Sequence, residues 1–85
     1  MLEANKVFVG GLNYATTEDE LKKEFERFGS IINVRVVRNH ETGQSRGFAF
    51  ITFETEEAAA QAVSGMDSQQ FGGRMIGVKI AYKRS

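Results

Sequence analysis

The chain has 85 residues, no cysteine, a single histidine and equal numbers of acidic and basic side chains, so its formal charge is zero. This length allows one small domain with a modest core. The missing cysteines exclude disulfides and thiol chemistry, and one histidine cannot build a histidine metal site. No apolar run is long enough to span a membrane, and no secretory signal precedes the first predicted strand. We therefore expect a soluble domain of a reducing compartment, or a piece of a longer protein, that holds no metal or other cofactor.

A strand and then a helix are predicted in the first third of the chain. Residues 6–10 alternate apolar and other side chains as a strand does. Thr17 followed by Glu20 is a capping box, which predicts that a helix begins there. Its apolar residues at helical spacing are Leu21, Phe25 and Phe28. Gly29 is expected to end this helix.

A second strand and a hairpin loop follow. Ile32, Val34 and Val36 alternate with Asn33, Arg35 and Val37, so the first three should share one face of a strand. Residues 39–44 are polar and contain Gly43, which predicts a hairpin loop into the next strand.

The most informative segment is the octapeptide of residues 46–53, Arg-Gly-Phe-Ala-Phe-Ile-Thr-Phe. In a strand, Arg46, Phe48 and Phe50 would point to one face, and the other face would carry Ala49, Ile51 and Phe53. One face is then a core surface, and the other is an aromatic platform beside a cation. The first strand has the same alternation and adds Phe8 to that platform.

The last third predicts a helix capped by Thr55, a turn at Gly72-Gly73 and a final strand. The apolar stripe of the helix is Ala59, Ala62, Val63 and Met66. Val78 and Ile80 mark the strand. The order β-α-β-β-α-β predicts an α+β ferredoxin-like sandwich, a four-stranded antiparallel sheet with two helices on one face and the strands of Phe8 and Phe50 at its centre. Nothing remains to cover the other face, so the three platform rings should be exposed.

Charge is distributed unevenly along these elements. Helices and their approaches hold Glu18, Asp19, Glu20, Glu24, Glu26, Glu54, Glu56 and Glu57. The strands and their ends hold Lys6, Arg35, Arg38, Arg46, Lys79, Lys83 and Arg84. The net charge would then be zero because the acidic surface of the helices cancels the basic surface of the sheet. Glu18 is expected to pair with Lys22, one helical turn away.

The octapeptide and the hexapeptide Val7–Leu12 closely resemble the RNA recognition motif family, especially its heteronuclear ribonucleoprotein and glycine-rich RNA-binding groups. The resemblance runs from Lys6 to Arg84, which implies a domain of residues 5–84 with flexible termini at 1–4 and 85. It implies that bases stack on Phe8 and Phe50, that Phe48 contacts ribose or a third base, and that Arg46 contacts phosphate. Two departures are Gly11, where many members have Asn, and the turn at Asp67-Ser68, where Asn-Gly is frequent.

The resemblance implies a monomeric, non-enzymatic module for single-stranded RNA, and also for single-stranded DNA, in the nucleus or cytoplasm and without a membrane. Base identity would be recognised near the sheet edges, including residues 79–84. The expected binding residues are Phe8, Phe48, Phe50, Arg46, Lys6, Arg35, Lys79, Ala81, Lys83 and Arg84.

Two alternatives share the predicted strand and helix order. Acylphosphatase-like enzymes need an arginine in the loop after the first strand, and residues 10–14 contain none. Peptide-binding members of the fold often lack the platform aromatics, which this chain retains. His40 is expected to be a loop residue, Tyr14 stays open, and alternation places Tyr82 with the core-facing set.

Overall fold

The computed structural model describes the backbone of residues 2–81, 83 and 84, and the side chains of residues 4–81. The main sheet contains β2 (Lys6–Gly10), β3 (Ile31–Arg38), β4 (Ser45–Phe53) and β7 (Gly77–Ile80). The helices are α1 (Glu18–Phe25), the 3-10 turn η1 (Glu26–Phe28) that continues it, and α2 (Glu56–Met66). Two short antiparallel pairs join β1 (Leu2–Glu3) to β8 (Lys83–Arg84) and β5 (Gln70–Phe71) to β6 (Arg74–Met75).

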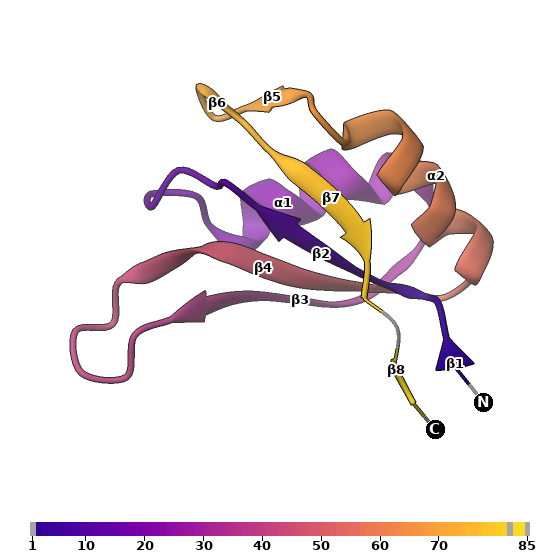
Figure 1. Cartoon of the computed structure of the whole chain (residues 1–85), viewed down its shortest axis with the longest axis horizontal. Helices are drawn as coiled ribbons and strands as arrows, with labels where there is room; N and C mark the ends of the chain where they lie inside the picture. Colours follow the sequence, from indigo (N-terminus) through magenta and orange to yellow (C-terminus); the bar gives the residue numbers. More distant parts are fainter. Residues whose placement is uncertain (1, 82, 85) are drawn as a thin grey trace.

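The main sheet is antiparallel throughout, in the order β3-β4-β2-β7, so β2 and β4 lie at its centre as predicted. In Figure 1 both helices lie behind the sheet and leave the near face of the sheet uncovered. The predicted α+β ferredoxin-like sandwich with β-α-β-β-α-β order is therefore confirmed.

The core fills the space between the sheet and the two helices. On β2 and β4, the buried residues alternate with half-buried or exposed ones, as strand geometry requires. The central strands contribute Val7, Val9, Ala49, Ile51 and Phe53, all fully buried. The helices contribute Leu21 and Phe25 from α1, and Ala58, Ala59, Ala62 and Met66 from α2. The predicted core-facing sides of both central strands are thus confirmed.

Both predicted helix starts are confirmed. Thr17 and Glu20 form a reciprocal capping box, in which each side chain accepts a hydrogen bond from the backbone N–H of the other residue. The Thr55 hydroxyl accepts a hydrogen bond from the backbone N–H of Ala58 at 3.1 Å. Such caps satisfy donors that the first helical turn leaves free, and each typically contributes about 1 kcal/mol.

The prediction that Ile32 points to the same face as Val34 and Val36 is wrong. Ile31 pairs with Phe53, and Asn33 already pairs with Thr52, so β3 has one extra residue between these two pairs. Such a bulge reverses the alternation at that point. Ile31 consequently packs against the core, and Ile32 is 62% exposed.

The turn after α2 has a backbone conformation that glycine usually adopts, although serine occupies the position. Ser68 has a φ of 64°, a left-handed conformation that is uncommon for residues other than glycine. Asp67 helps to hold the turn, because its carboxylate accepts a hydrogen bond from the backbone N–H of Val78 at 2.9 Å.

The predicted turn at Gly72-Gly73 is confirmed and connects β5 to β6, two strands that were not predicted.

Candidate nucleic-acid interface

Three phenylalanine rings form a cluster on the uncovered face of the sheet, which we call the platform. Its members are Phe8 of β2 and Phe48 and Phe50 of β4. The ring centroid of Phe8 lies 5.6 Å from that of Phe48 and 5.7 Å from that of Phe50. Because the rings pack against one another, they are half-buried, whereas the sequence predicted exposed rings. The separations fall in the range of favourable aromatic pairs.

The sheet register places a cation on each side of the platform. Phe8 and Phe50 are direct partners across β2 and β4. Arg35 of β3 is the partner of Phe50, and Lys79 of β7 is the partner of Phe8. A row across all four strands therefore reads cation, ring, ring, cation. Neighbouring strands lie about 4.8 Å apart, so this row extends about 14 Å across the sheet.

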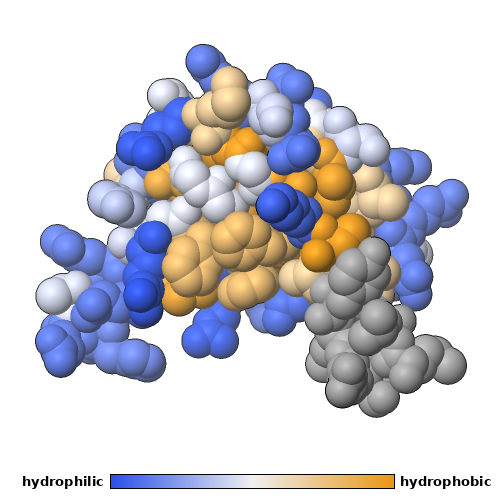
Figure 2. Space-filling view, in the orientation of Figure 1, coloured by the Kyte–Doolittle hydropathy of each residue, from blue (hydrophilic) through white to orange (hydrophobic). Residues whose placement is uncertain are grey.

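Lys6 belongs to the same face. Its ammonium nitrogen lies 4.8 Å from the ring centroid of Phe50, which is a cation–π contact. Figure 2 shows the same face as Figure 1, with a light-orange patch at its centre and dark-blue hydrophilic residues on both sides of it. The apolar platform thus has a basic rim, which supplies the two elements that a nucleic acid requires, a stacking surface and cations for phosphate.

Gly10 is part of the platform geometry, a role that was not predicted from the sequence. A Cβ atom at Gly10 would lie 2.9 Å from Cε1 of Phe8, so the Phe8 ring covers this glycine. Gly10 also pairs with Phe48 across the sheet. Its position in the hexapeptide, two residues after Phe8 on the same side of the strand, was the signal that could have identified it.

Two polar residues near the platform, Thr52 and Asn33, were not predicted as site residues. Thr52 of β4 pairs with Lys6 on one side and with Asn33 on the other. Thr52 alternates with the buried Ile51 and Phe53, which places it on the platform side. Lys6, Thr52 and Asn33 thus form a second row across the sheet, which adds hydrogen-bonding groups next to the aromatic row. The alternation of side chains along β4 was sufficient to predict the position of Thr52.

Arg46 lies where β4 leaves the platform, and its side chain is exposed. The next residue, Gly47, has a φ of 83°, a conformation that favours glycine. Its carbonyl accepts a hydrogen bond from the backbone N–H of Leu12 at 2.9 Å, which ties β4 to the loop after β2. Tyr14 of that loop is 71% exposed, and its ring packs against Gly47.

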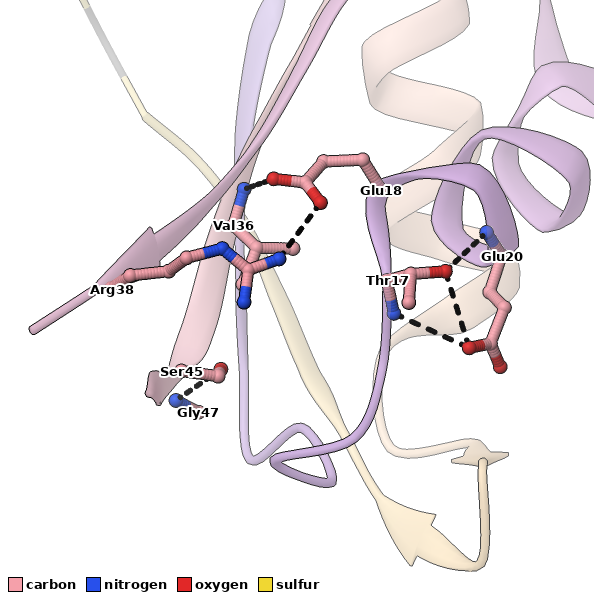
Figure 3. Close-up of polar contacts among 7 residues, drawn as sticks. All are labelled: Thr17, Glu18, Glu20, Val36, Arg38, Ser45 and Gly47. Carbon is pink, nitrogen blue, oxygen red and sulfur yellow. Dashed lines mark hydrogen bonds and ion pairs between the residues drawn. The ribbon is translucent and has the colours of Figure 1, made fainter. Parts of the chain in front are cut away.

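The charge separation between helices and sheet is less complete than predicted. Glu18 at the start of α1 accepts a hydrogen bond from Arg38 at 3.0 Å and another from the backbone N–H of Val36 at 3.3 Å (Figure 3). The predicted pairing of Glu18 with Lys22 is therefore replaced by one with Arg38. Partial burial raises the pKa of Glu18, but hydrogen bonds from its own backbone, from Val36 and from Arg38 outweigh this and lower the pKa below its ordinary value of 4.5.

The remaining predicted site residues follow β7 in the chain. The backbone N–H of Ala81 donates to the carbonyl of Lys6 at 2.8 Å, so this N–H is not available to a ligand. Predictions for Tyr82 and for the side chains of Lys83 and Arg84 fall outside the described residues. His40 is exposed in the hairpin loop, as expected.

Among residues 4–81, no three His, Asp or Glu side chains lie close enough together to hold a metal ion. Over the same residues, no helix is both long and apolar enough to cross a membrane.

Comparison with known proteins gives concordant matches. The sequence model described as "RNA recognition motif" matches residues 7–77. Glycine-rich RNA-binding protein 4, mitochondrial, from Arabidopsis thaliana is 42% identical over 82 residues, which cover 96% of this chain and 60% of that protein. A glycine-rich RNA-binding protein from Daucus carota is 42% identical over 79 residues, covering 93% of this chain and 50% of that protein.

Solved structures agree with the sequence matches. The crystal structure of RNA-binding protein PG1 has a TM-score of 0.89 and 38% identity, and covers 94% of this chain and 96% of that one. The structure of the Rna15 RRM with bound RNA (GU) has a TM-score of 0.82 and 29% identity, covering 93% of this chain and 84% of that one. The chain spans between 27% and 60% of the length of the curated relatives it matches.

Proposed function

The chain belongs to the RNA recognition motif family, and from this premise we propose that it binds single-stranded RNA on the uncovered face of its sheet. The observation that carries the proposal is the row Arg35, Phe50, Phe8, Lys79, in which two aromatic partners stand between two cations. A similar structure contains bound RNA, which supports RNA as the ligand class. We assign the domain to residues 5–84.

In this proposal, the platform supplies most of the affinity. Bases stack on Phe8 and Phe50, and Phe48 contacts a ribose or a third base. Stacking of a base on an aromatic ring is worth about 1 to 3 kcal/mol. Two or three such contacts give moderate affinity, so one domain works best with a neighbouring domain or tail.

The basic rim holds the backbone of the RNA. Arg46, Arg35 and Lys79 contact phosphates, and Lys6 leaves the ring of Phe50 when a base takes its place. Phosphate contacts position a strand and carry no base information. Base identity is then recognised by polar groups beside the platform, with Thr52 and Asn33 at one side and residues 79–84 at the other.

The proposal includes several finer points. The domain acts as a monomer and without catalysis, in the nucleus or cytoplasm, although several relatives carry the word mitochondrial in their names. Single-stranded DNA binds as well, because stacking and phosphate contacts need no 2′-hydroxyl group. A peptide ligand is the second candidate for this fold, but the retained aromatic platform favours RNA.

A competition experiment tests the ligand form. An A-form duplex keeps its base faces inside the helix, so the platform can stack only on unpaired bases. A fluorescent single-stranded oligonucleotide bound to the domain should be displaced far better by the same unlabelled strand than by that strand annealed to its complement. Equal displacement by the duplex would mean that the domain recognises phosphate alone, and the stacking proposal would fail.

A further inference from the structure

A hollow of about 460 Å³ lies on α2, in the helical layer behind the sheet in Figure 1. Its lining consists of Phe28 of η1 and, from α2, Glu57, Ala60, Gln61, Ser64 and Gly65. The buried face of α2 is formed by other residues, Ala58, Ala59, Ala62 and Met66. The volume lies in the range of about 300 to 1,000 Å³ that is typical of ligand pockets. We call this hollow the α2 groove.

The α2 groove has a floor of small side chains and one aromatic wall. Ala60, Ser64 and Gly65 are exposed, and Phe28 is half-buried. A Cβ atom at Gly65 would lie 2.6 Å from Cε1 of Phe28, so the ring packs directly on the backbone of the helix. Glycine is unfavourable inside a helix, and this close approach explains its presence here. The groove therefore offers one apolar side chain a place between the Phe28 ring and the helix.

The aromatic wall is held in place by its neighbours. The guanidinium carbon of Arg27 lies 4.7 Å from the ring centroid of Phe28, and the ring centroid of Phe25 lies 6.3 Å from it. Arg27 is itself fixed, because it pairs with Glu24 at 3.1 Å and donates to the sulfur of Met66 at 3.0 Å. The wall is thus formed before any ligand arrives, as is usual for binding sites.

The charge around the α2 groove is negative. Glu57 is the one charged residue of its lining. Residues 24–28 and 54–66, the segments that surround the groove, contain the carboxylates Glu24, Glu26, Glu54, Glu56 and Glu57. Against these stands Arg27 alone, which pairs with Glu24. Such a field attracts cations and repels phosphate, so the groove suits a basic ligand and disfavours RNA.

The length of the α2 groove matches a short peptide. Its lining on α2 runs from Glu57 to Gly65, which is about 12 Å at 1.5 Å per helical residue. An extended peptide advances about 3.3 to 3.6 Å per residue, so three or four residues span the groove. A lysine or arginine next to an apolar residue can then reach Glu57 while the apolar side chain lies against Phe28.

We propose that the α2 groove binds a short segment of another protein, in which one large apolar side chain is flanked by lysine or arginine. The apolar side chain lies between Phe28 and Ala60, and a flanking cation contacts Glu57. The groove is in the helical layer, whereas the platform is on the uncovered face of the sheet. The peptide therefore leaves the platform free, and its binding is independent of the proposed RNA binding.

Capped pentapeptides test this proposal. Four have the sequence Lys-Lys-Xaa-Lys-Lys, with leucine, methionine, phenylalanine or tryptophan as the central residue, and a fifth has serine there. Amide NMR signals of the unmodified chain are followed during each titration. At least one of the four apolar peptides should shift the signals of Phe28 and of residues 57–65. It should bind at least about threefold more tightly than the serine peptide, the gain expected from burying half of an apolar side chain.

Three variants separate a local contact from general attraction. Glu57→Gln should weaken binding of the apolar peptide about two- to fivefold, as the loss of one exposed ion pair does. Glu41→Gln makes the same charge change in the β3–β4 hairpin and should leave the affinity unchanged. Ala60→Gln places a longer side chain in the groove and should reduce the affinity to that of the serine peptide. Glu57 and Ala60 are exposed, so these variants should fold like the unmodified chain, which thermal unfolding checks.

Four outcomes would overturn the proposal. The first is that none of the apolar peptides shifts residues 57–65 at millimolar concentration, the weak end of specific binding. The second is equal affinity for the serine peptide, or an equal effect of Glu57→Gln and Glu41→Gln, which would show attraction by net charge alone. The third is that the shifts lie in β2 and β4, which would place the peptide on the platform. The fourth is that residues 57–65 shift when the chain is concentrated alone, which would make a second copy the occupant.

Discussion

Phe50 and Phe53 are three residues apart on β4, and their side chains lie on opposite faces of the sheet. Phe53 is fully buried in the core, whereas Phe50 is half-buried among the platform rings. The same residue type in the same strand therefore has two different roles. In one, burial stabilises the fold, and in the other, the remaining exposed surface is available for a base.

Alanine substitution should separate these roles. Phe53→Ala leaves a core cavity and should destabilise the fold by about 3 to 5 kcal/mol. Phe50→Ala removes contacts between platform rings and should cost only about 1 kcal/mol of stability. RNA affinity should instead fall by about 1 to 3 kcal/mol in Phe50→Ala, through loss of one stacked base. Urea unfolding and a binding titration on both variants check this contrast.

The face assignment fails if the two variants lose equal stability. It also fails if Phe50→Ala binds RNA as the unmodified chain does, because the platform then contributes nothing to affinity.

Among the elements, α1 and β3 are linked by Glu18. Its carboxylate accepts hydrogen bonds from Arg38 and from the backbone N–H of Val36, which belongs to the outer strand β3 of the sheet. The lowered pKa of Glu18 means that the folded state favours the charged carboxylate. Folding therefore gains stability from this group above its unfolded pKa, near 4.5, and loses the gain as pH falls through the lower folded pKa.

Glu18→Gln should reveal this pH dependence. Near neutral pH the variant should be less stable than the unmodified chain by under about 1 kcal/mol, since both partners are substantially exposed. The difference should shrink as the pH falls below about 4.5. Urea unfolding at several pH values measures it, and Glu41→Gln in the hairpin loop provides a control without this ion pair. A difference that stays constant with pH would contradict the assignment of the effect to the charged carboxylate.

Sequence patterns predicted those elements whose signals are local. The capping box at Thr17 and the strict alternation of residues 46–53 each lie within one element, and both are confirmed. The bulge at Ile32 was not predictable, because Ile31 and Ile32 are adjacent apolar residues and alternation cannot decide which one faces the core. Glu18 was assigned to Lys22 because that pairing is local, whereas Arg38 is 20 positions away and comes close only through packing of α1 on β3.

The sequence also predicted part of the candidate site. Parity placed Phe8, Phe48 and Phe50 on one face, and this is confirmed. The register between strands decides how far these rings are buried. It also decides that Arg35 and Lys79 lie at the two ends of one row.

For the molecule as a whole, zero net charge does not oppose RNA binding, because a ligand responds to the local field. The platform is flanked by Arg35, Lys79 and Lys6, and the helices carry most of the described acidic residues. Binding should then combine a few phosphate contacts with stacking that salt does not weaken.

Salt dependence should reflect this combination. The logarithm of affinity should fall with the logarithm of salt concentration by about 0.7 per neutralised phosphate, for about two to four phosphates. Arg46→Ala should reduce this slope by the amount that belongs to about one phosphate contact. It should weaken binding to all RNA sequences by the same factor. Lys22→Ala and Lys23→Ala, on α1, should change neither slope nor affinity. A steep slope that responds to Lys22 and Lys23 as strongly as to Arg46 would move the binding surface to the helices.

Amide NMR signals followed during titration with a mixed-sequence single-stranded RNA hexamer test the central claim most directly. If RNA lies on the uncovered face of the sheet, the largest shifts should occur in β2 and β4 around Phe8 and Phe50, and extend to Arg35 and Lys79 at the ends of the row. Amides in the middle of α1 and α2 should scarcely move. Shifts concentrated on these helices, with β2 and β4 unchanged, would contradict RNA binding on the platform.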